Sequence, residues 1–142
     1  MKVETAFLAQ AAEVSGDGRI FVYGGGIEGL ITPTVPLVVP QISIVVRLHF
    51  LLGECGTSHN LRITMSDSDG EDCGLDATVS VNPVVPEYMP DRGTRLFATF
   101  GVNYLKFDQF GVYAVNVFVG DERLDGFTIG VHQAKPPEEE GN

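Results

Sequence analysis

The sequence predicts an all-β protein, an antiparallel β-sandwich of the immunoglobulin-like or Greek-key kind with about eight to ten strands. Three observations lead to this class. Apolar residues alternate with polar ones at a period of two along most of the chain. After residue 15 no helical stripe of comparable length occurs. The 17 Gly and 8 Pro residues are spread along the chain, as in a protein with many turns.

Residues 41–52 are the clearest predicted strand, because their apolar side chains fall on one face. That face carries Ile42, Ile44, Val46, Leu48 and Phe50, and the other carries Ser43, Val45, Arg47, His49 and Leu51. The composition of residues 2–14 also suits a helix. We expect these residues to form a hairpin with residues 19–24. Further strands are expected at 27–32, 59–67, 72–82, 95–102, 111–119 and 122–131.

Two Pro-rich stretches, 33–40 and 82–93, are predicted to be loops or edge segments that cross between the sheets, because Pro cannot donate to a sheet ladder. The 142 residues suit one domain. We therefore expect a single sandwich domain at 1–133, followed by an acidic, flexible tail at 134–142.

Charge limits the range of partners. Nine basic residues face nineteen acidic ones, a formal net charge of −10. This balance predicts no binding to nucleic acid or to anionic membranes, both of which require a basic surface. It favours solubility or a basic partner. No secretory signal is recognised, and the longest apolar run contains Arg47 and His49. A cytoplasmic protein with reduced cysteines is expected.

A G-x-G-x-x-G pattern occurs at Gly24, Gly26 and Gly29 after a predicted strand. In a dinucleotide-binding fold, a helix must follow these glycines and hold the pyrophosphate at its N-terminus. The three prolines between residues 33 and 40 forbid that helix. The pattern is therefore interpreted as a kink or bulge between two strands, and no cofactor is predicted.

The stretch SDSDGED, residues 66–72, resembles a calcium loop at first sight. With Gly70 at the sixth position, Asp67 and Asp69 fall at the third and fifth positions. The first ligand would then be Met65, and strands rather than helices flank the loop. The chain is predicted to hold no metal, and Asp67, Asp69 and Glu71 remain the candidate ligands of a divalent cation.

A hairpin turn explains this stretch better, because apolar residues alternate on both sides of it. A three-residue loop of Ser68, Asp69 and Gly70 keeps the apolar residues on one face, with Gly70 at the left-handed position. It also places Arg62 opposite Asp76 on the outer face. The expected apolar pairs are Met65 with Cys73, Ile63 with Leu75 and Leu61 with Ala77.

The C-terminal third contains two further local signals. In DQFGVYAV, the spacing of Asp108, Gly111 and Tyr113 resembles the tyrosine corner of immunoglobulin-like sandwiches, with a departure of one residue before the glycine. The last hairpin is expected to turn at Gly120–Asp121 and to pair Val117 with Leu124. A change of apolar parity after Leu124 predicts a bulge near residues 125–126.

The residues with catalytic chemistry form no recognisable motif. Cys55 and Cys73 are expected at opposite ends of one hairpin, of order 25 Å apart at ~3.3 Å per residue, so no disulfide is predicted. Both cysteines are interpreted as small, mostly buried thiols. The three histidines match no zinc or hydrolase pattern. A hydrolase site assembled across loops, with His49 or His59, is an alternative.

The segments KVETAFLAQAAEV, GRIFVYGGGIEGL and PLVVPQISIVVRLHF resemble an uncharacterised bacterial family of small, single-domain β-sandwich proteins. Members share a K-V-E-x-A-F-L-A start, a Gly-rich GGG turn, a Pro before a long central strand and a closing G-x-Y-x-x-x-V hairpin. The resemblance covers residues 2–131 and implies strand for residues 2–14. It implies a bacterial, cytoplasmic setting and carries no activity with it.

The sequence therefore predicts a non-enzymatic β-sandwich that binds a protein partner or assembles with further copies of itself. The alternatives are a calcium-binding domain that uses the acidic turn at residues 67–72, and the hydrolase described above. No catalytic residue and no cofactor are assigned.

Overall fold

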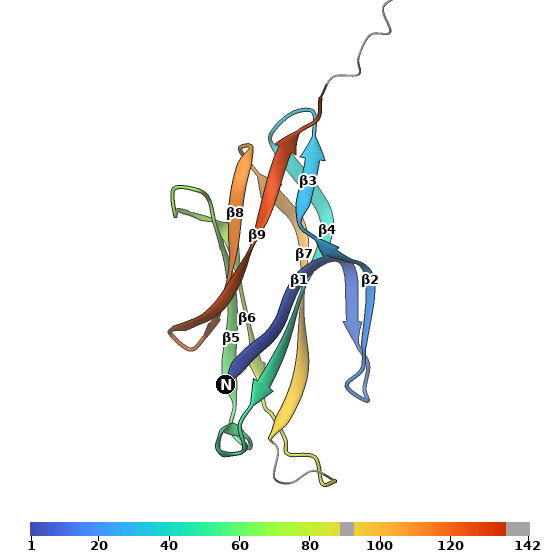
Figure 1. The fold of residues 1–142 in the computed structure, drawn as a ribbon, viewed down its shortest axis with the longest axis vertical. Coiled ribbons are helices and arrows are strands. Elements are labelled where there is room, and N and C mark those ends of the chain that lie inside the picture. Colours follow the sequence, from blue (N-terminus) through green and yellow to red (C-terminus); the bar gives the residue numbers. More distant parts are fainter. Residues whose placement is uncertain (89–92, 136–142) are drawn as a thin grey trace, which may run out of the picture.

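Nine strands form two packed sheets in residues 1–88 and 93–135, the part of the chain that this computed structural model describes (Figure 1). The predicted all-β sandwich is confirmed. The first sheet has the strand order β2–β1–β4–β7, and the second has the order β3–β9–β8–β5–β6. All neighbouring strands are antiparallel except β3 and β9, which run parallel.

The predicted strands correspond to the observed ones, several of which are longer. The bounds are β1 Lys2–Val14, β2 Ile20–Ile27, β3 Gly29–Thr32, β4 Leu37–Phe50, β5 His59–Ser66, β6 Asp72–Val81, β7 Thr94–Phe107, β8 Gly111–Val119 and β9 Glu122–Gln133. A single turn of 3₁₀ helix at Leu52–Glu54 follows β4. Within the described residues, no helix has the length and apolar character needed to cross a membrane.

The core lies between the two sheets and is built from alternate residues of each strand. The five predicted core residues of β4 are all at most 1% exposed, so this prediction is confirmed. Leu61, Ile63 and Val117 contribute fully buried side chains from the second sheet. Each such side chain stabilises the fold by about 1.5–3 kcal/mol relative to an exposed one.

Both Pro-rich stretches connect one sheet to the other, as expected. Residues 33–36 lead from β3 in the second sheet to β4 in the first. Residues 37–40 lie beyond the crossing, since they form the start of β4, and they are an edge segment, the other predicted alternative. This part of β4 pairs with β7 alone, because the pairing of β1 with β4 ends at Ala9 and Ser43. Pro40 therefore interrupts no ladder on the β1 side.

Along the paired strands β4 and β7, the side chains that point into the core switch from one strand face to the other at Pro40 and Tyr104. Phe100 and Leu105 are both buried although their positions differ in parity. Between them Tyr104 has a positive φ of 55° and is 74% exposed. This left-handed residue rotates the strand, which explains why β7 continues five residues beyond the predicted end at 102.

Tyr113 makes the contact expected of a tyrosine corner. Its hydroxyl donates to the carbonyl oxygen of Gln109 at 2.9 Å and accepts from the Gln109 N–H at 3.1 Å. The ring packs edge-on against Phe107, with centroids 5.0 Å apart. The side chain thus closes the corner between β7 and β8.

The last hairpin turns at Gly120–Asp121, as predicted, with Val119 paired to Glu122. The predicted pair of Val117 with Leu124 is wrong, because Val117 pairs with Asp125. The register shifts between Val117 and Phe118, so the bulge lies at Leu124, one residue before the predicted position. The extra residue restores the apolar side chains that follow to the core face.

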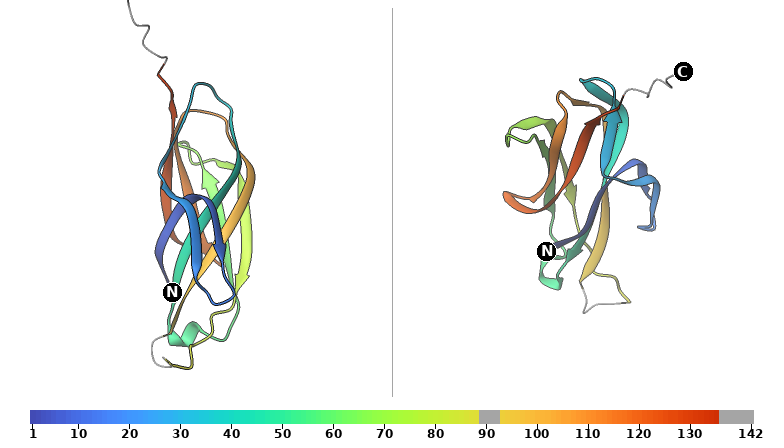
Figure 2. Two further views of the ribbon diagram at one scale, coloured as in Figure 1. Left: turned by 90° about the vertical axis from the view of Figure 1, so that its right-hand side faces the viewer. Right: turned by 45° about the horizontal axis from the view of Figure 1, so that its top comes forward.

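The β1–β2 hairpin leaves the first sheet and curves back beside the sandwich (Figures 1 and 2). We call residues 10–26 the arm. Beyond Ala9, β1 pairs only with β2. The predicted hairpin is confirmed, and so is the glycine kink: Gly24 and Gly26 have φ of 60° and 84°, and the register shifts opposite them. A strand, not a helix, follows the glycines, so the context of a dinucleotide site is missing.

The predicted tail at 134–142 lies outside the described residues from position 136 onward. The same holds for residues 89–92 of the second Pro-rich stretch.

Replacing Tyr104 by Gly is expected to raise the free energy of unfolding by about 0.5–1 kcal/mol. The left-handed conformation costs a residue with a Cβ roughly 1–2 kcal/mol, which outweighs the entropy that Gly loses. Replacing Tyr104 by Val is expected to lower the free energy of unfolding, because a β-branched residue tolerates this φ least. Urea unfolding measures both free energies. A Tyr104→Gly variant that is less stable than the parent would contradict the claim that the left-handed conformation strains Tyr104.

Candidate functional site

The acidic turn is a tight hairpin loop in which Asp67 acts as a structural residue. The Gly70 N–H donates to the Asp67 carbonyl at 3.0 Å, and the Asp67 N–H donates to the Glu71 carbonyl at 2.9 Å. Gly70 has a φ of 80°. These contacts confirm the three-residue loop and the role of Gly70 in it. Asp67 Oδ1 also accepts from the N–H groups of Asp69 and Glu71, at 2.9 and 3.0 Å.

The predicted pairing of β5 with β6 is wrong beyond the turn. Ile63 pairs with Ala77 and Leu61 with Val79, because two additional residues of β6 bulge between the pairs Ser66–Asp72 and Thr64–Asp76. Gly74, with a φ of 78°, lies in this bulge. A shift of two residues leaves every side chain on its predicted face, which is why the apolar pattern did not reveal it.

Arg62 and Asp76 form the predicted ion pair, although they are diagonal rather than opposed. Arg62 donates through Nε and Nη2 to the two carboxylate oxygens of Asp76, both at 2.8 Å. The guanidinium of Arg62 lowers the pKa of Asp76, and the carboxylate raises the pKa of Arg62. The guanidinium also lies 5.9 Å from the centre of the Phe118 ring. The contact runs diagonally across the regular part of the ladder, since Arg62 pairs with Thr78 and Asp76 pairs with Thr64.

As candidate metal ligands, Asp67, Asp69 and Glu71 do not converge. In residues 1–88 and 93–135, no group of three or more His, Cys, Asp or Glu side chains is arranged to hold a metal ion. The carboxylate of Asp67 already accepts two backbone N–H groups. The side chains of the turn thus order the loop itself.

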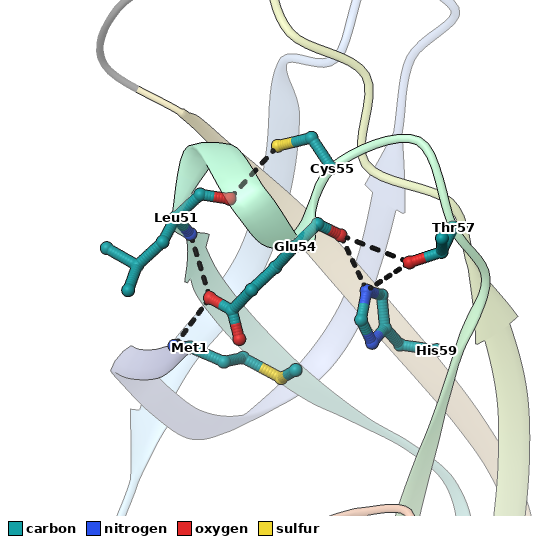
Figure 3. A network of polar contacts seen from close by, with 6 residues as sticks. All are labelled: Met1, Leu51, Glu54, Cys55, Thr57 and His59. Carbon is teal, nitrogen blue, oxygen red and sulfur yellow. Dashed lines mark hydrogen bonds and ion pairs between the residues drawn. The ribbon is translucent and has the colours of Figure 1, made fainter.

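His59 holds the loop that follows β4 in place (Figure 3). Its Nε2 lies 2.7 Å from the carbonyl oxygen of Glu54 and 3.3 Å from the hydroxyl of Thr57. A carbonyl can only accept, so Nε2 carries the proton and donates it. The ring also packs against Phe50, with centroids 5.2 Å apart. In this arrangement Nε2 is not available as a base.

Glu54, in the same loop, pairs with the amino group of Met1 at 2.6 Å (Figure 3). Its carboxylate also accepts from the Leu51 N–H at 2.9 Å. The ammonium group is the largest cause that lowers the pKa of Glu54. The Cys55 thiol donates to the Leu51 carbonyl at 3.4 Å. The loop is therefore ordered by contacts among its own residues and with β1.

His49 lies away from His59, on the outer face of β4. Its neighbours across the sheet are Lys2 and Arg95, and its Nε2 is buried without a hydrogen-bond partner among the described residues. On the same face, the guanidinium of Arg47 lies over the Phe97 ring at 5.3 Å. Four of the hollows among the described residues have walls to which neither His49 nor His59 contributes.

Cys55 and Cys73 are free thiols, and both are half-buried against the core. Burial raises the pKa of Cys73, and the neighbouring carboxylates, with Asp67 first among them, raise it further. A raised pKa keeps the thiol protonated at neutral pH and hence unreactive. Cys73 donates to the Glu71 carbonyl at 3.3 Å, so it too is part of the turn.

The arm carries the largest group of exposed apolar side chains that are consecutive in the sequence. Phe21, Val22 and Tyr23 are 62%, 40% and 73% exposed. They border a hollow of about 540 Å³ whose other walls are Ala11, Ala12, Glu13 and Gln41. An exposed apolar patch on a folded protein commonly marks a contact surface.

Sequence reasoning missed this surface. A run of apolar residues such as IFVY is typical of a strand buried on both faces. Here the glycines 24–26 bend the hairpin away from the core, and both faces of β2 become exposed. The sequence feature that could have indicated this surface is the absence of any charged residue between residues 20 and 27.

The protein belongs to a family, since residues 4–132 match the one described as "Family of unknown function (DUF6941)". This match confirms the predicted membership of an uncharacterised family. No curated protein matches the chain.

Among solved structures, the chain is similar to part of a beta-glucosidase from Listeria innocua. Against the complex with isofagomine, the TM-score is 0.45 and the identity 13%, over 74% of this chain and 15% of the other. Against the complex with glucose, the TM-score is 0.43 and the identity 11%, over 75% and 15%. The chain thus spans about 15% of the length of these structures, and so distant a likeness carries no argument about activity.

Replacing Asp67 by Ala is expected to lower the free energy of unfolding by about 1 kcal/mol, because two backbone N–H groups lose their acceptor. Replacing Asp69 by Ala is the matched control and is expected to change the free energy of unfolding by less than about 0.5 kcal/mol. Urea unfolding at neutral pH compares the two. Equal effects of both substitutions would contradict the structural role of Asp67.

The Arg62–Asp76 pair predicts a pH dependence. Because the folded-state pKa of Asp76 lies below its unfolded value, the pair stabilises the fold above about pH 4. That stabilisation is lost as the pH falls through the folded-state pKa. In the Arg62→Gln variant, the pKa of Asp76 is expected to return toward its ordinary value, and stability should fall less steeply below pH 4. NMR titration of Asp76 and unfolding at pH 2–5 measure the two effects; an unchanged pKa rules out the pair as the cause.

Proposed function

We propose that this protein is a non-enzymatic binding or assembly module, and that the β2 edge of the arm contacts its protein partner. The observation that carries the proposal is the exposure of three consecutive apolar residues, Phe21, Val22 and Tyr23, on an edge strand without charge. An edge strand offers unpaired N–H and C=O groups to a second strand.

The other sheet edges support this choice because each has a feature that discourages strand pairing. β3 is only four residues long. β6 carries Asp72 and Asp76, and β7 carries Arg95 and Lys106 together with the left-handed Tyr104. Charges, kinks and short lengths are the devices by which proteins protect edges. β2 has a kink at Gly24–Gly26, but among the edges in the described residues it is the only one that is longer than four residues and carries no charge.

The immunoglobulin-like classification and the cytoplasmic setting remain predictions of the sequence. So do the absence of nucleic-acid and membrane partners and the absence of enzymatic activity. The charge balance supports the absence of nucleic-acid and membrane partners, and the two free cysteines support the cytoplasmic setting.

Size-exclusion chromatography with light scattering, together with affinity capture from a lysate of the source cells, tests the proposal. The parent protein should self-associate or retain a protein, and the variants Phe21→Ser and Tyr23→Ser should lose that association. Tyr104→Ser is the matched control, because Tyr104 is 74% exposed, like Tyr23 at 73%, and lies on another edge strand. A monomer at all concentrations that retains no protein would end the proposal.

A further inference from the structure

We infer that the partner at the β2 edge is a second copy of this chain, whose β2 pairs antiparallel with the first across a two-fold axis at Val22. This inference rests on the proposed function, because it names the partner of the same surface. The two arms would together form a four-stranded sheet in the order β1–β2–β2–β1.

The side-chain pattern of β2 complements itself in this register. With the axis at Val22, Phe21 lies opposite Tyr23 of the second copy, and Tyr23 lies opposite its Phe21. Opposed residues of an antiparallel pair share a face. All four rings therefore gather on one face of the new sheet, where aromatic pairs add about 0.5–1.5 kcal/mol each beyond their burial.

Neighbouring registers lose these contacts. An axis at Phe21 would place Tyr23 opposite the charged Arg19 of the second copy. An axis at Tyr23 would place Phe21 opposite Gly25, which offers no side chain. A two-fold axis midway between two residues is excluded, because it would oppose residues of different parity, whereas opposed residues of an antiparallel pair share a face.

The bend of the arm keeps the aromatic face free. A Cβ added at Gly25 would meet Val22 Cγ1 at 2.7 Å and the Phe7 ring at 3.2 Å, so Val22 points toward the base of the arm. Phe21 and Tyr23 alternate with Val22 along the strand and so project from the opposite face. Their exposed fractions, 62% and 73% against 40%, agree with this placement.

Charge favours a second copy at this edge over any other edge. Each chain has a net charge of −10, so two copies repel one another. The arm contributes Glu13 and Asp17 against Arg19, a net charge of −1, and residues 20–27 contribute none. At the tip Asp17 and Arg19 form an ion pair at 2.7 Å, and Arg19 is the largest cause that lowers the pKa of Asp17 to about 2.

The buried area predicts a reversible dimer. Each aromatic side chain can bury about 150–250 Å², and four such rings with the paired backbones put the interface on the order of 1,000 Å². That value lies at the lower end of specific interfaces. Salt is expected to strengthen the dimer, because it screens the repulsion of two acidic chains beyond about 10 Å at 0.1 M. A complex with a basic partner would instead weaken as the salt concentration rises, because salt also screens the attraction between opposite charges.

Cysteine crosslinking tests the register directly. In a parent with Cys55→Ala and Cys73→Ala, the variant Val22→Cys places two thiols face to face across the axis, about 4.5–5.5 Å apart at Cβ. The matched control, Ile20→Cys, lies on the same strand face but is displaced from its counterpart by four residues, about 13 Å. Under mild oxidation, Val22→Cys is expected to form covalent dimers at least tenfold faster than Ile20→Cys.

The other outcomes separate the two proposals. A light-scattering mass near that of one chain at all salt concentrations, with capture of a partner that Tyr23→Ser abolishes, overturns the second copy and leaves the proposed function. Crosslinking of Ile20→Cys at the rate of Val22→Cys overturns the register. A monomer without any partner overturns both proposals. Thermal unfolding of each variant shows that the fold is intact.

Discussion

Burial of the inner face of β4 positions the other elements of this molecule. β4 lies between β1 and β7, and its five alternate apolar side chains fill the space between the two sheets. Because a shift of one residue would turn all of them away from the second sheet, the register of β4 is strongly specified. β1 stays paired with β4 as far as Ala9, and β7 stays paired to the start of β4 but turns its other face to the core from Tyr104 onward. At these two points the chain departs from the regular sheet, and the departures produce the arm and the twisted end of β7.

The glycines of the arm explain why β2 is exposed to the solvent. Gly24 and Gly26 adopt conformations that residues with a Cβ rarely reach, and they let the hairpin bend out of the first sheet. As a result, the exposed stretch Phe21–Tyr23 of β2 lies away from the core, while Ile27 still packs against it, and the aromatic side chains of this stretch face the solvent. An uncharged, exposed edge strand promotes association with other chains, which a monomeric protein has to prevent. Its presence here, beside three protected edges, is most simply understood as a surface that pairs.

The residues with reactive chemistry have structural roles elsewhere. His59 donates to a backbone carbonyl, Asp67 accepts from two backbone N–H groups, and Cys73 donates to the carbonyl of the same turn. Each is a polar group that satisfies the backbone of a loop, where no sheet ladder can do so. Arg62 forms a two-point ion pair with Asp76 on the outer face of the same hairpin. The acidic turn and the histidine loop are thus ordered ends of strands.

Alternation of apolar residues and the placement of Gly and Pro determined the class of fold, most strands, the inward face of the central part of β4 and the three-residue turn at Gly70. These features are local, with periods of two residues and turns of three, and one sequence contains them in full. Tertiary structure decided the pairing of β5 with β6, because a shift of two residues preserves every face. It likewise decided the extension of β4 and β7, because the left-handed Tyr104 changes the face that β7 turns to the core. It also decided whether IFVY lies inside or outside. That outcome depends on the bend at three glycines and on where β1 parts from β4, and neither is fixed by the pattern of β2 itself.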